Sequence, residues 1–211
     1  MNVIQKKSKP RLKNEGAILT AAEEVFSEVG FAGATTSLIA KRAGIPKANL
    51  HYYYPTKEML YQTIIDKIFT VWLRAAESFD DCDVPADALR RYIQVKMEIS
   101  RAHPLGSKIW AQEIMNGGTQ IESFLETTLK DWTESRVKII ERWVAEDKIN
   151  VINPHYLLYM IWATTQHYAD FGRQVSVLNG GGELSDASFA EATETVVQII
   201  LRGIGASDSP H

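Results

Sequence analysis

Residues 36–55 read TSLIAKRAGIPKANLHYYYP and indicate two short helices joined by a tight turn. Ala40 is small at the position where the two helices cross, and Gly44 suits the left-handed backbone of the turn. Residues 18–29, just upstream, carry apolar residues at helical spacing and end before Gly30, a typical helix terminator. Three apolar residues of the pair would hold it against this upstream helix: Ile39, Ile45 and Leu50.

A three-helix unit of this kind is typical of helix-turn-helix DNA-binding domains, in which the second helix of the pair enters the major groove. That helix is expected to start at Pro46, and its polar side chains can reach phosphates or base edges. Lys57 begins the next helix, where its ammonium group and the backbone N–H groups can hold a phosphate. The predicted DNA contacts are Thr35, Thr36, Lys47, Ala48, Asn49, His51, Tyr52 and Lys57. An ordinary helix pair with a glycine turn is the alternative.

The charge distribution also favours a nucleic-acid partner. Residues 1–57 hold nine Lys or Arg and four acidic residues, a net charge of +5, whereas the remaining 154 residues have a net charge of −8. A basic end on an acidic body is typical of a segment that meets a polyanion. Five of the nine bases lie in residues 6–13, which predicts a basic flexible tail over 1–13; a solvated tail without a partner is the other interpretation.

The rest of the chain also has helical periodicity, with no alternating stretch of the kind that predicts a strand. We therefore expect an all-α fold of about nine helices. The predicted helices beyond the pair cover residues 56–79, 86–102, 108–115, 119–148, 154–171 and 185–203, with Gly180–Gly182 in a loop.

Several classes of protein are disfavoured. The one cysteine, Cys82, excludes a disulfide scaffold and a four-cysteine zinc site. No signal peptide or run of ~20 apolar residues is apparent, so we expect a cytoplasmic protein without a membrane partner. The motifs of hydrolases, metalloproteases and nucleotide-binding enzymes are missing, so we expect no catalytic residue, no cofactor and no enzymatic activity. Three histidines are too scattered to predict a metal site: His103, His155 and His167.

The run GFAGATTSLIAKRAGIPKANLHYYYPTKEML (residues 30–60) resembles the DNA-binding signature of the TetR family of bacterial repressors. The resemblance implies a homodimer on a palindromic operator. It implies a helix-turn-helix domain over residues 14–55, a ligand-binding and dimerisation domain over 56–205 and a tail over 206–211. It also implies that the long helix 56–79 links the ligand site to the DNA reader. Three positions depart from the family pattern: Leu38 replaces an acid, Pro46 a capping Ser or Thr, and His51 a Leu or Tyr.

Three C-terminal segments (93–104, 155–171 and 196–204) are similar to TetR-type repressors of bacterial pyrimidine utilisation. This resemblance implies that the effector is a pyrimidine such as uracil or thymine. Such a ring needs flat apolar walls and a few hydrogen-bonding groups, and a glutamine amide can pair with its edge. The predicted ligand-binding residues are Trp72, Trp110, Trp162, Gln166 and Tyr168.

Other interpretations remain open for these residues and for the function. Trp162 and Gln166 lie one helical turn apart, and that spacing is also typical of packing or dimer contacts. The effector of a TetR-type regulator could equally be an unrelated metabolite such as a purine or an apolar compound. A nucleic-acid-binding protein without an effector is a further alternative.

The last helix, residues 185–203, has apolar residues on two sides. Two apolar sides indicate burial against more than the helix's own core. We therefore expect residues 154–171 and 185–203 of two subunits to form a four-helix bundle, as in the family; a fully internal helix is the alternative.

Overall fold

The computed structural model describes residues 9–75 and 82–206, and every regular element in these residues is a helix. Helices α7, η2 and α8 follow one another without a break and count as one. The described residues therefore form ten separate helices, where about nine were predicted. The all-α fold class is confirmed. The elements in chain order are α1 (Lys9–Gly33), α2 (Thr36–Arg42), α3 (Lys47–Tyr53), α4 (Lys57–Ala75), α5 (Pro85–Ala102), α6 (Pro104–Met115), α7 (Glu122–Phe124), η2 (Leu125–Leu129), α8 (Lys130–Ala145), α9 (Pro154–Asp170), α10 (Gly172–Leu178) and α11 (Asp186–Gly203).

Helix α1 is longer than the sequence predicted. It starts at Lys9, so residues 9–13 of the expected tail are helical; residues 1–8 lie outside the described residues. Gly30 has φ 68° and ψ 178°, a conformation that glycine adopts without a side-chain clash. The helix therefore bends at the residue where it was predicted to end, and one further turn follows to Gly33.

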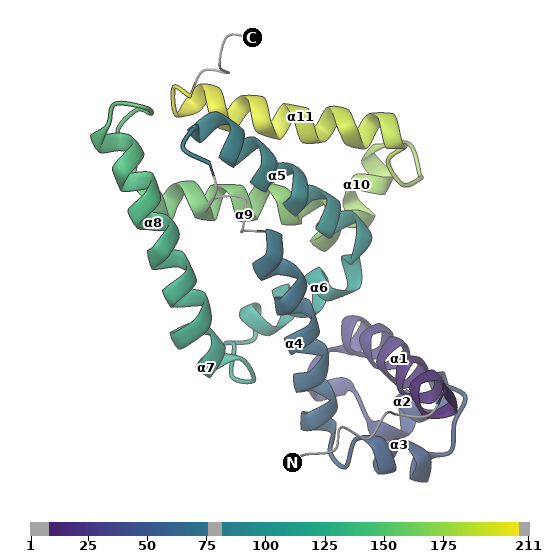
Figure 1. The fold of residues 1–211 in the computed structure, drawn as a ribbon. Helices are drawn as coiled ribbons and strands as arrows, with labels where there is room; N and C mark the ends of the chain where they lie inside the picture. Colours follow the sequence, from purple (N-terminus) through teal and green to yellow (C-terminus); the bar gives the residue numbers. More distant parts are fainter. Residues whose placement is uncertain (1–8, 76–81, 207–211) are drawn as a thin grey trace.

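Two hydrophobic cores hold the helices together, and α4 runs from the first core to α5, a helix of the second (Figure 1). The first core lies between α1, α2, α3, α4 and α6, and the second between α5, α8, α9 and α11. Fully buried members of the first are Ile18, Phe26, Ile39, Leu50, Leu60 and Ile64. Fully buried members of the second are Leu89, Ile93, Met97, Ile140, Trp143 and Ile161. The core of the first three helices thus continues along α4 into α6, so the N-terminal unit is packed against the larger body.

The C-terminal half corrects three predicted boundaries. Helix α6 starts at Pro104 and not at residue 108, because proline is well suited to the first turn of a helix. The run predicted over 119–148 is helical over 122–145 and contains the π-helical turn η2. Helix α10 was not predicted at all and lies between the predicted helix 154–171 and the expected glycine loop, where Gly180 and Gly181 have positive φ values of 84° and 102°. No helix within the described ranges is long and apolar enough to span a bilayer.

Candidate functional site

Helices α2 and α3 form the predicted helix pair. Gly44 has φ 66° in the connecting turn, and the Ile45 N–H donates to the Ala40 carbonyl oxygen at 3.1 Å. Ile39 and Leu50 are fully buried in the core shared with α1. A tight turn and a shared apolar anchor are the defining contacts of a helix-turn-helix unit, so this prediction is confirmed.

Arg42 fixes α2 to α1 at the protein surface. Its guanidinium donates to both carboxylate oxygens of Glu28 at 2.9 Å and to Glu24 at 3.2 Å. These hydrogen bonds hold the pKa of Glu28 below its usual range and raise the pKa of Arg42. The groups are exposed, so the two-point geometry sets the angle between the helices more than it adds stability.

The outward face of α3 carries most of the predicted DNA contacts. Four of them are exposed, Tyr52 at 72%: Lys47, Ala48, Asn49 and Tyr52. His51 is half-buried, and its Nδ1 lies 3.2 Å from the Pro55 carbonyl oxygen. His51 thus contacts the segment that follows its own helix, whereas Asn49 and Lys47 are exposed to solvent.

The start of α2 supplies the remaining predicted contacts of the helix pair. Thr35 is the N-cap, and its Oγ1 accepts from the Leu38 N–H at 3.1 Å, which leaves the hydroxyl hydrogen to donate elsewhere. Thr36 is half-buried at the first position of the helix. Pro46 makes no side-chain cap for α3, as its replacement of a Ser or Thr implied.

The ammonium group of Lys57 contacts the protein itself. Its ammonium group donates to the carbonyl oxygens of Phe31 at 2.7 Å and Ala34 at 3.1 Å, and it lies 4.2 Å from the centre of the Phe31 ring. These contacts tie the start of α4 to the connection between α1 and α2. Two of the three N–H groups of the ammonium are therefore held by protein carbonyl oxygens, and the phosphate contact of Lys57 stays a prediction.

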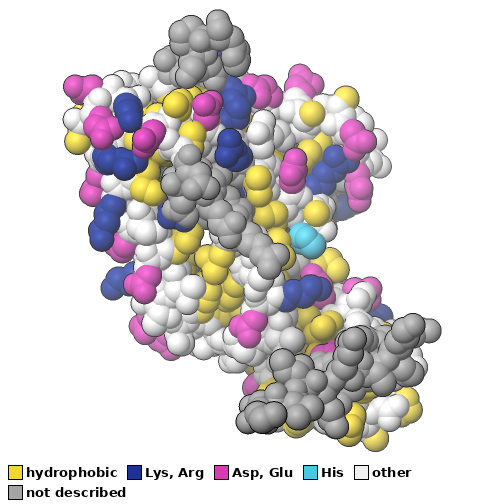
Figure 2. Space-filling model, in the orientation of Figure 1, with side chains coloured by type: hydrophobic (Ala, Val, Ile, Leu, Met, Phe, Trp, Pro, Cys, Tyr) yellow, Lys and Arg dark blue, Asp and Glu magenta, His cyan; other side chains and the backbone are white. Residues whose placement is uncertain are grey.

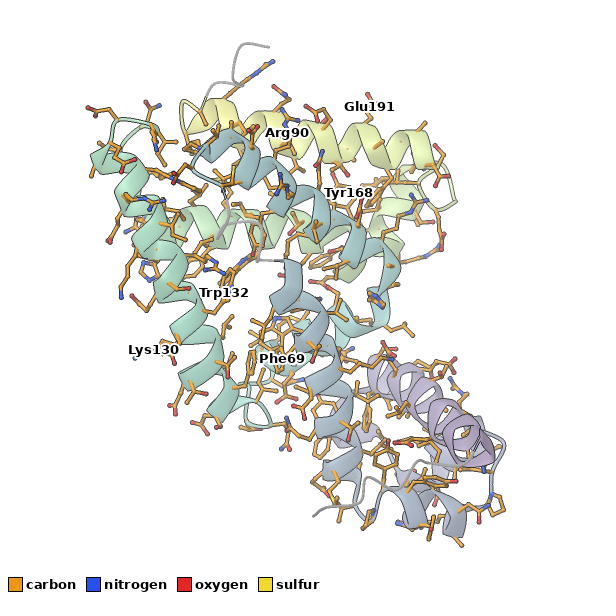
Figure 3. The ribbon with its side chains drawn as sticks, in the orientation of Figure 1. Phe69, Arg90, Lys130, Trp132, Tyr168 and Glu191 are labelled. Carbon is orange, nitrogen blue, oxygen red and sulfur yellow. The ribbon has the colours of Figure 1, made fainter. Side chains whose placement is uncertain are left out.

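A cavity of about 70 Å³ with aromatic walls lies where the two cores meet. Figure 2 shows hydrophobic side chains gathered between α4 and α8, and Figure 3 shows Phe69 and Trp132 on these two helices. The ring centroids of Trp72 and Trp110 are 5.5 Å apart and nearly perpendicular. The aromatic walls are Phe69, Trp72, Trp110, Phe124, Trp132 and Trp162.

Three polar side chains also line the cavity: Tyr92, Lys96 and Gln166. The Trp162 indole N–H donates to the Tyr92 hydroxyl oxygen at 2.9 Å, and burial raises the pKa of Tyr92. Within the described part of the chain, neither Lys96 nor Gln166 forms a hydrogen bond or an ion pair. The cavity therefore combines flat apolar walls with two uncommitted polar groups, as a site for a small planar ligand requires.

Lys96 is 6% exposed, and its ammonium group lies 4.8 Å from the centre of the Trp72 ring. Burial lowers its pKa to about 8, against the attraction of Asp170. Asp170 is itself engaged, since its carboxylate accepts from the Ser107 hydroxyl at 2.5 Å, and burial raises its pKa. The positive charge of Lys96 is therefore held inside the protein, and no carboxylate among the residues that the structure describes forms an ion pair with it.

The structure brings four of the five predicted ligand residues to this cavity: Trp72, Trp110, Trp162 and Gln166. Tyr168 does not line it. Two residues after Gln166 the helix has turned by about 200°, so Tyr168 faces the other way and packs against Phe189 with ring centroids 6.3 Å apart. Figure 3 shows Tyr168 well away from Phe69 and Trp132.

Lys96 is the polar residue that sequence reasoning missed. It falls between buried apolar positions of α5, since Tyr92, Ile93 and Met97 are all in the core. A lysine on the buried face of an amphipathic helix is a detectable signal, because lysine is almost never fully buried unless it has a function or a partner. Phe69, Phe124 and Trp132 carry no comparable signal and are found only from the packing.

Helix α6 connects the cavity to the DNA-binding domain. Trp110 of α6 lines the cavity, and two residues later the Gln112 side-chain amide donates to the Ser27 carbonyl oxygen on α1 at 3.1 Å. The next residue, Glu113, is buried and accepts from the Tyr61 hydroxyl on α4 at 2.8 Å. A displacement of Trp110 would therefore act on α1 and α4 through these two hydrogen bonds, and both helices pack against the helix pair.

Comparison with known proteins agrees with this arrangement. Residues 18–64 match the family described as "Bacterial regulatory proteins, tetR family", and residues 65–207 match "YcdC-like protein, C-terminal region". The chain is 37% identical over 199 residues to the HTH-type transcriptional regulator RutR of Escherichia coli K12, covering 94% of both chains.

Solved structures show the same fold at lower identity. The ketosteroid transcriptional regulator KstR2 of Mycobacterium tuberculosis aligns with a TM-score of 0.71 at 20% identity, covering 97% of this chain and 98% of KstR2. The fatty acid degradation regulator FadR of Bacillus halodurans aligns with a TM-score of 0.66 at 14% identity, covering 96% of this chain and all of FadR. With its helix-turn-helix unit, its helical body and a family match over most of its length, this chain belongs to the TetR family of bacterial transcriptional regulators.

Proposed function

We propose that the protein is a ligand-responsive transcriptional repressor that binds a palindromic operator in the cytoplasm as a homodimer. The exposed side chains of α3 support direct reading of a major groove, with Asn49 suited to adenine and Lys47 to guanine or phosphate. In a dimer, two copies of α3 would enter grooves about one helical turn of DNA apart, roughly 34–36 Å.

The proposed dimer uses α9 and α11. Large apolar side chains remain exposed on these helices in the single chain: Tyr156 is 67% exposed, Met160 53% and Ile199 65%. Exposed apolar side chains on neighbouring helices are typical of an interaction surface. Packing of this pair against its copy would form the four-helix bundle expected from the sequence.

The proposed effector is a pyrimidine such as uracil or thymine. The observation that carries this proposal is the uncommitted Gln166 amide in a cavity walled by Trp72, Trp110 and Trp162. An amide offers one donor and one acceptor side by side, which matches the N–H and carbonyl groups of a pyrimidinedione edge. The similarity of three C-terminal segments to pyrimidine-utilisation repressors supports the same ligand.

Calorimetric titration tests the effector, with uracil and thymine as ligands and cytosine, xanthine and adenine as comparisons. We expect saturable binding of uracil or thymine near one per subunit. Gln166→Ala should lower the affinity at least tenfold, because a buried ring edge loses its partner. Operator binding by the same preparations, followed by fluorescence anisotropy, should respond to uracil in the wild type and not in Gln166→Ala. Protein that binds operator DNA but none of these bases would contradict the effector proposal.

A further inference from the structure

Burial of the Lys96 ammonium group is energetically unfavourable when no ligand occupies the cavity. The helix α5 presents a continuous apolar face, and Lys96 lies in that face between Ile93 and Met97, both fully buried. Moving an ammonium group out of water is unfavourable unless it is paired. Neither the Trp72 ring nor Asp170, which is bonded to Ser107, provides a hydrogen bond to it.

The cavity as a whole is rich in hydrogen-bond donors. Lys96 offers three N–H groups, and Gln166 offers two beside one carbonyl oxygen. The indole N–H of Trp132 is a further buried donor that has no hydrogen-bond partner in the described residues. The hydroxyl oxygen of Tyr92 already accepts from Trp162. A ligand that satisfies this set must therefore present more than one acceptor along its edges.

We propose that Lys96 is the specificity-determining residue of the effector cavity and selects planar rings that carry two oxo groups over rings in which an amino group replaces one of them. This inference rests on the proposed pyrimidine effector and deepens it. A 2,4-dioxopyrimidine gives one oxo group to the Lys96 ammonium and keeps an N–H and a second oxo group for Gln166. A 4-amino-2-oxopyrimidine such as cytosine has a single oxo group and brings a donor to a cavity already rich in donors.

The hydrogen-bonding chemistry of the two side chains explains why Lys96, and not Gln166, selects between the rings. A glutamine amide can rotate and exchange its donor for its acceptor, so it accepts either an oxo or an amino group. An ammonium group has no acceptor and cannot adapt. The adaptable group binds the ring edge, and the ammonium rejects the amino-substituted ring, because an unpaired buried donor weakens binding.

The test compares uracil and cytosine binding by calorimetry for the full-length wild type, Lys96→Met and Lys96→Gln. Lys130→Met, at an exposed lysine on α8, serves as the matched control. We expect the wild type to prefer uracil at least tenfold. Lys96→Met should lose at least tenfold in uracil affinity and retain less than a threefold preference. Lys96→Gln should shift the preference toward cytosine, since its amide can accept from the amino group.

Thermal melting and circular dichroism establish that each variant is folded, and Lys130→Met should bind like the wild type. If the wild type binds uracil and Lys96→Met binds it equally well with the same preference, the role of Lys96 is wrong while the pyrimidine effector stands. Equal binding of uracil and cytosine by the wild type also overturns it. A wild type that binds no pyrimidine overturns both the effector and the selection by Lys96.

Discussion

Replacing Lys96 with methionine should stabilise the ligand-free protein. The pKa of Lys96 is lowered from 10.5 to about 8, which corresponds to a cost of about 3 kcal/mol for holding the charge inside the fold near neutral pH. The contact of the ammonium with the Trp72 ring offsets about 1 kcal/mol of this cost, and it would be lost with the charge. Methionine is unbranched and of similar length, so it can fill the same space. The net expectation is a gain of about 2 kcal/mol.

The sign of the pH dependence provides an independent check. The pKa of Lys96 is lower in the folded state than in the unfolded state. Such a lysine disfavours folding most at a pH where it is charged in both states, which here means below pH 8. Between pH 8 and 10.5 the folded state loses the proton first, so the wild type gains stability as the pH rises. The advantage of Lys96→Met over the wild type should therefore shrink from pH 7 to pH 10. Tyr61 and Tyr92, whose pKa values are raised, affect both proteins alike.

Differential scanning calorimetry at pH 7, 8, 9 and 10 without ligand measures both effects. For a chain of this length, 2 kcal/mol corresponds to a rise in Tm of roughly 4–8 °C. Lys130→Met, at an exposed site, should change the free energy of unfolding by less than about 0.5 kcal/mol. A Lys96→Met protein that melts below the wild type by the same margin at every pH would show that the ammonium is well paired, and the reasoning about the cavity would fail.

Three further substitutions test the DNA-binding domain and the dimer. Asn49→Ala should relax base preference at one operator position by about 1–3 kcal/mol while leaving binding to unrelated DNA unchanged; an unaltered preference in a sequence-selection assay would exclude direct reading by Asn49. Lys57→Met should lower the Tm by roughly 4–8 °C, because the carbonyl groups of Phe31 and Ala34 lose a charged donor worth about 2 kcal/mol; an unchanged Tm with weaker DNA binding would show that Lys57 acts mainly as a phosphate contact. Ile199→Glu should give monomers in light scattering, since a charge on the exposed face of α11 opposes its burial; intact dimers would place the interface elsewhere.

The DNA-binding domain could be predicted from sequence because its structure depends on local rules. Gly44 needs a positive φ, Ala40 needs to be small, and Leu50 needs to be buried, and all three requirements are visible within one short stretch. The same rules do not reveal the intramolecular contacts of Lys57, because its partners on Phe31 and Ala34 lie 26 and 23 residues away in sequence. No local pattern indicates that an ammonium group will be taken up by distant carbonyl groups.

The proposed effector cavity was only partly predictable for a related reason. Trp162 and Gln166 share one face of α9, so helical spacing alone places them together. Tyr168 was grouped with them because it is aromatic and close in sequence, although the helix turns it away. Lys96 was recognisable as a charge on an apolar face, but its meaning depends on α4 and α9, which bring Trp72 and Gln166 to the same space.

The contacts of α6 set the size of the signal that the cavity can send. A ligand that displaces Trp110 must either move α1 together with α6 or break the hydrogen bond from Gln112 to Ser27, and it meets a second link where Glu113 accepts from Tyr61. Each such bond contributes about 1 kcal/mol, and more where the acceptor is charged, so breaking both would cost about 2–3 kcal/mol. If α1 and α4 move together with α6, both hydrogen bonds are kept and the position of α3, which packs against α1, changes. A coupling of 1–3 kcal/mol changes operator affinity by about 5- to 150-fold, so these two bonds are sufficient to transmit a response of the size that regulation requires.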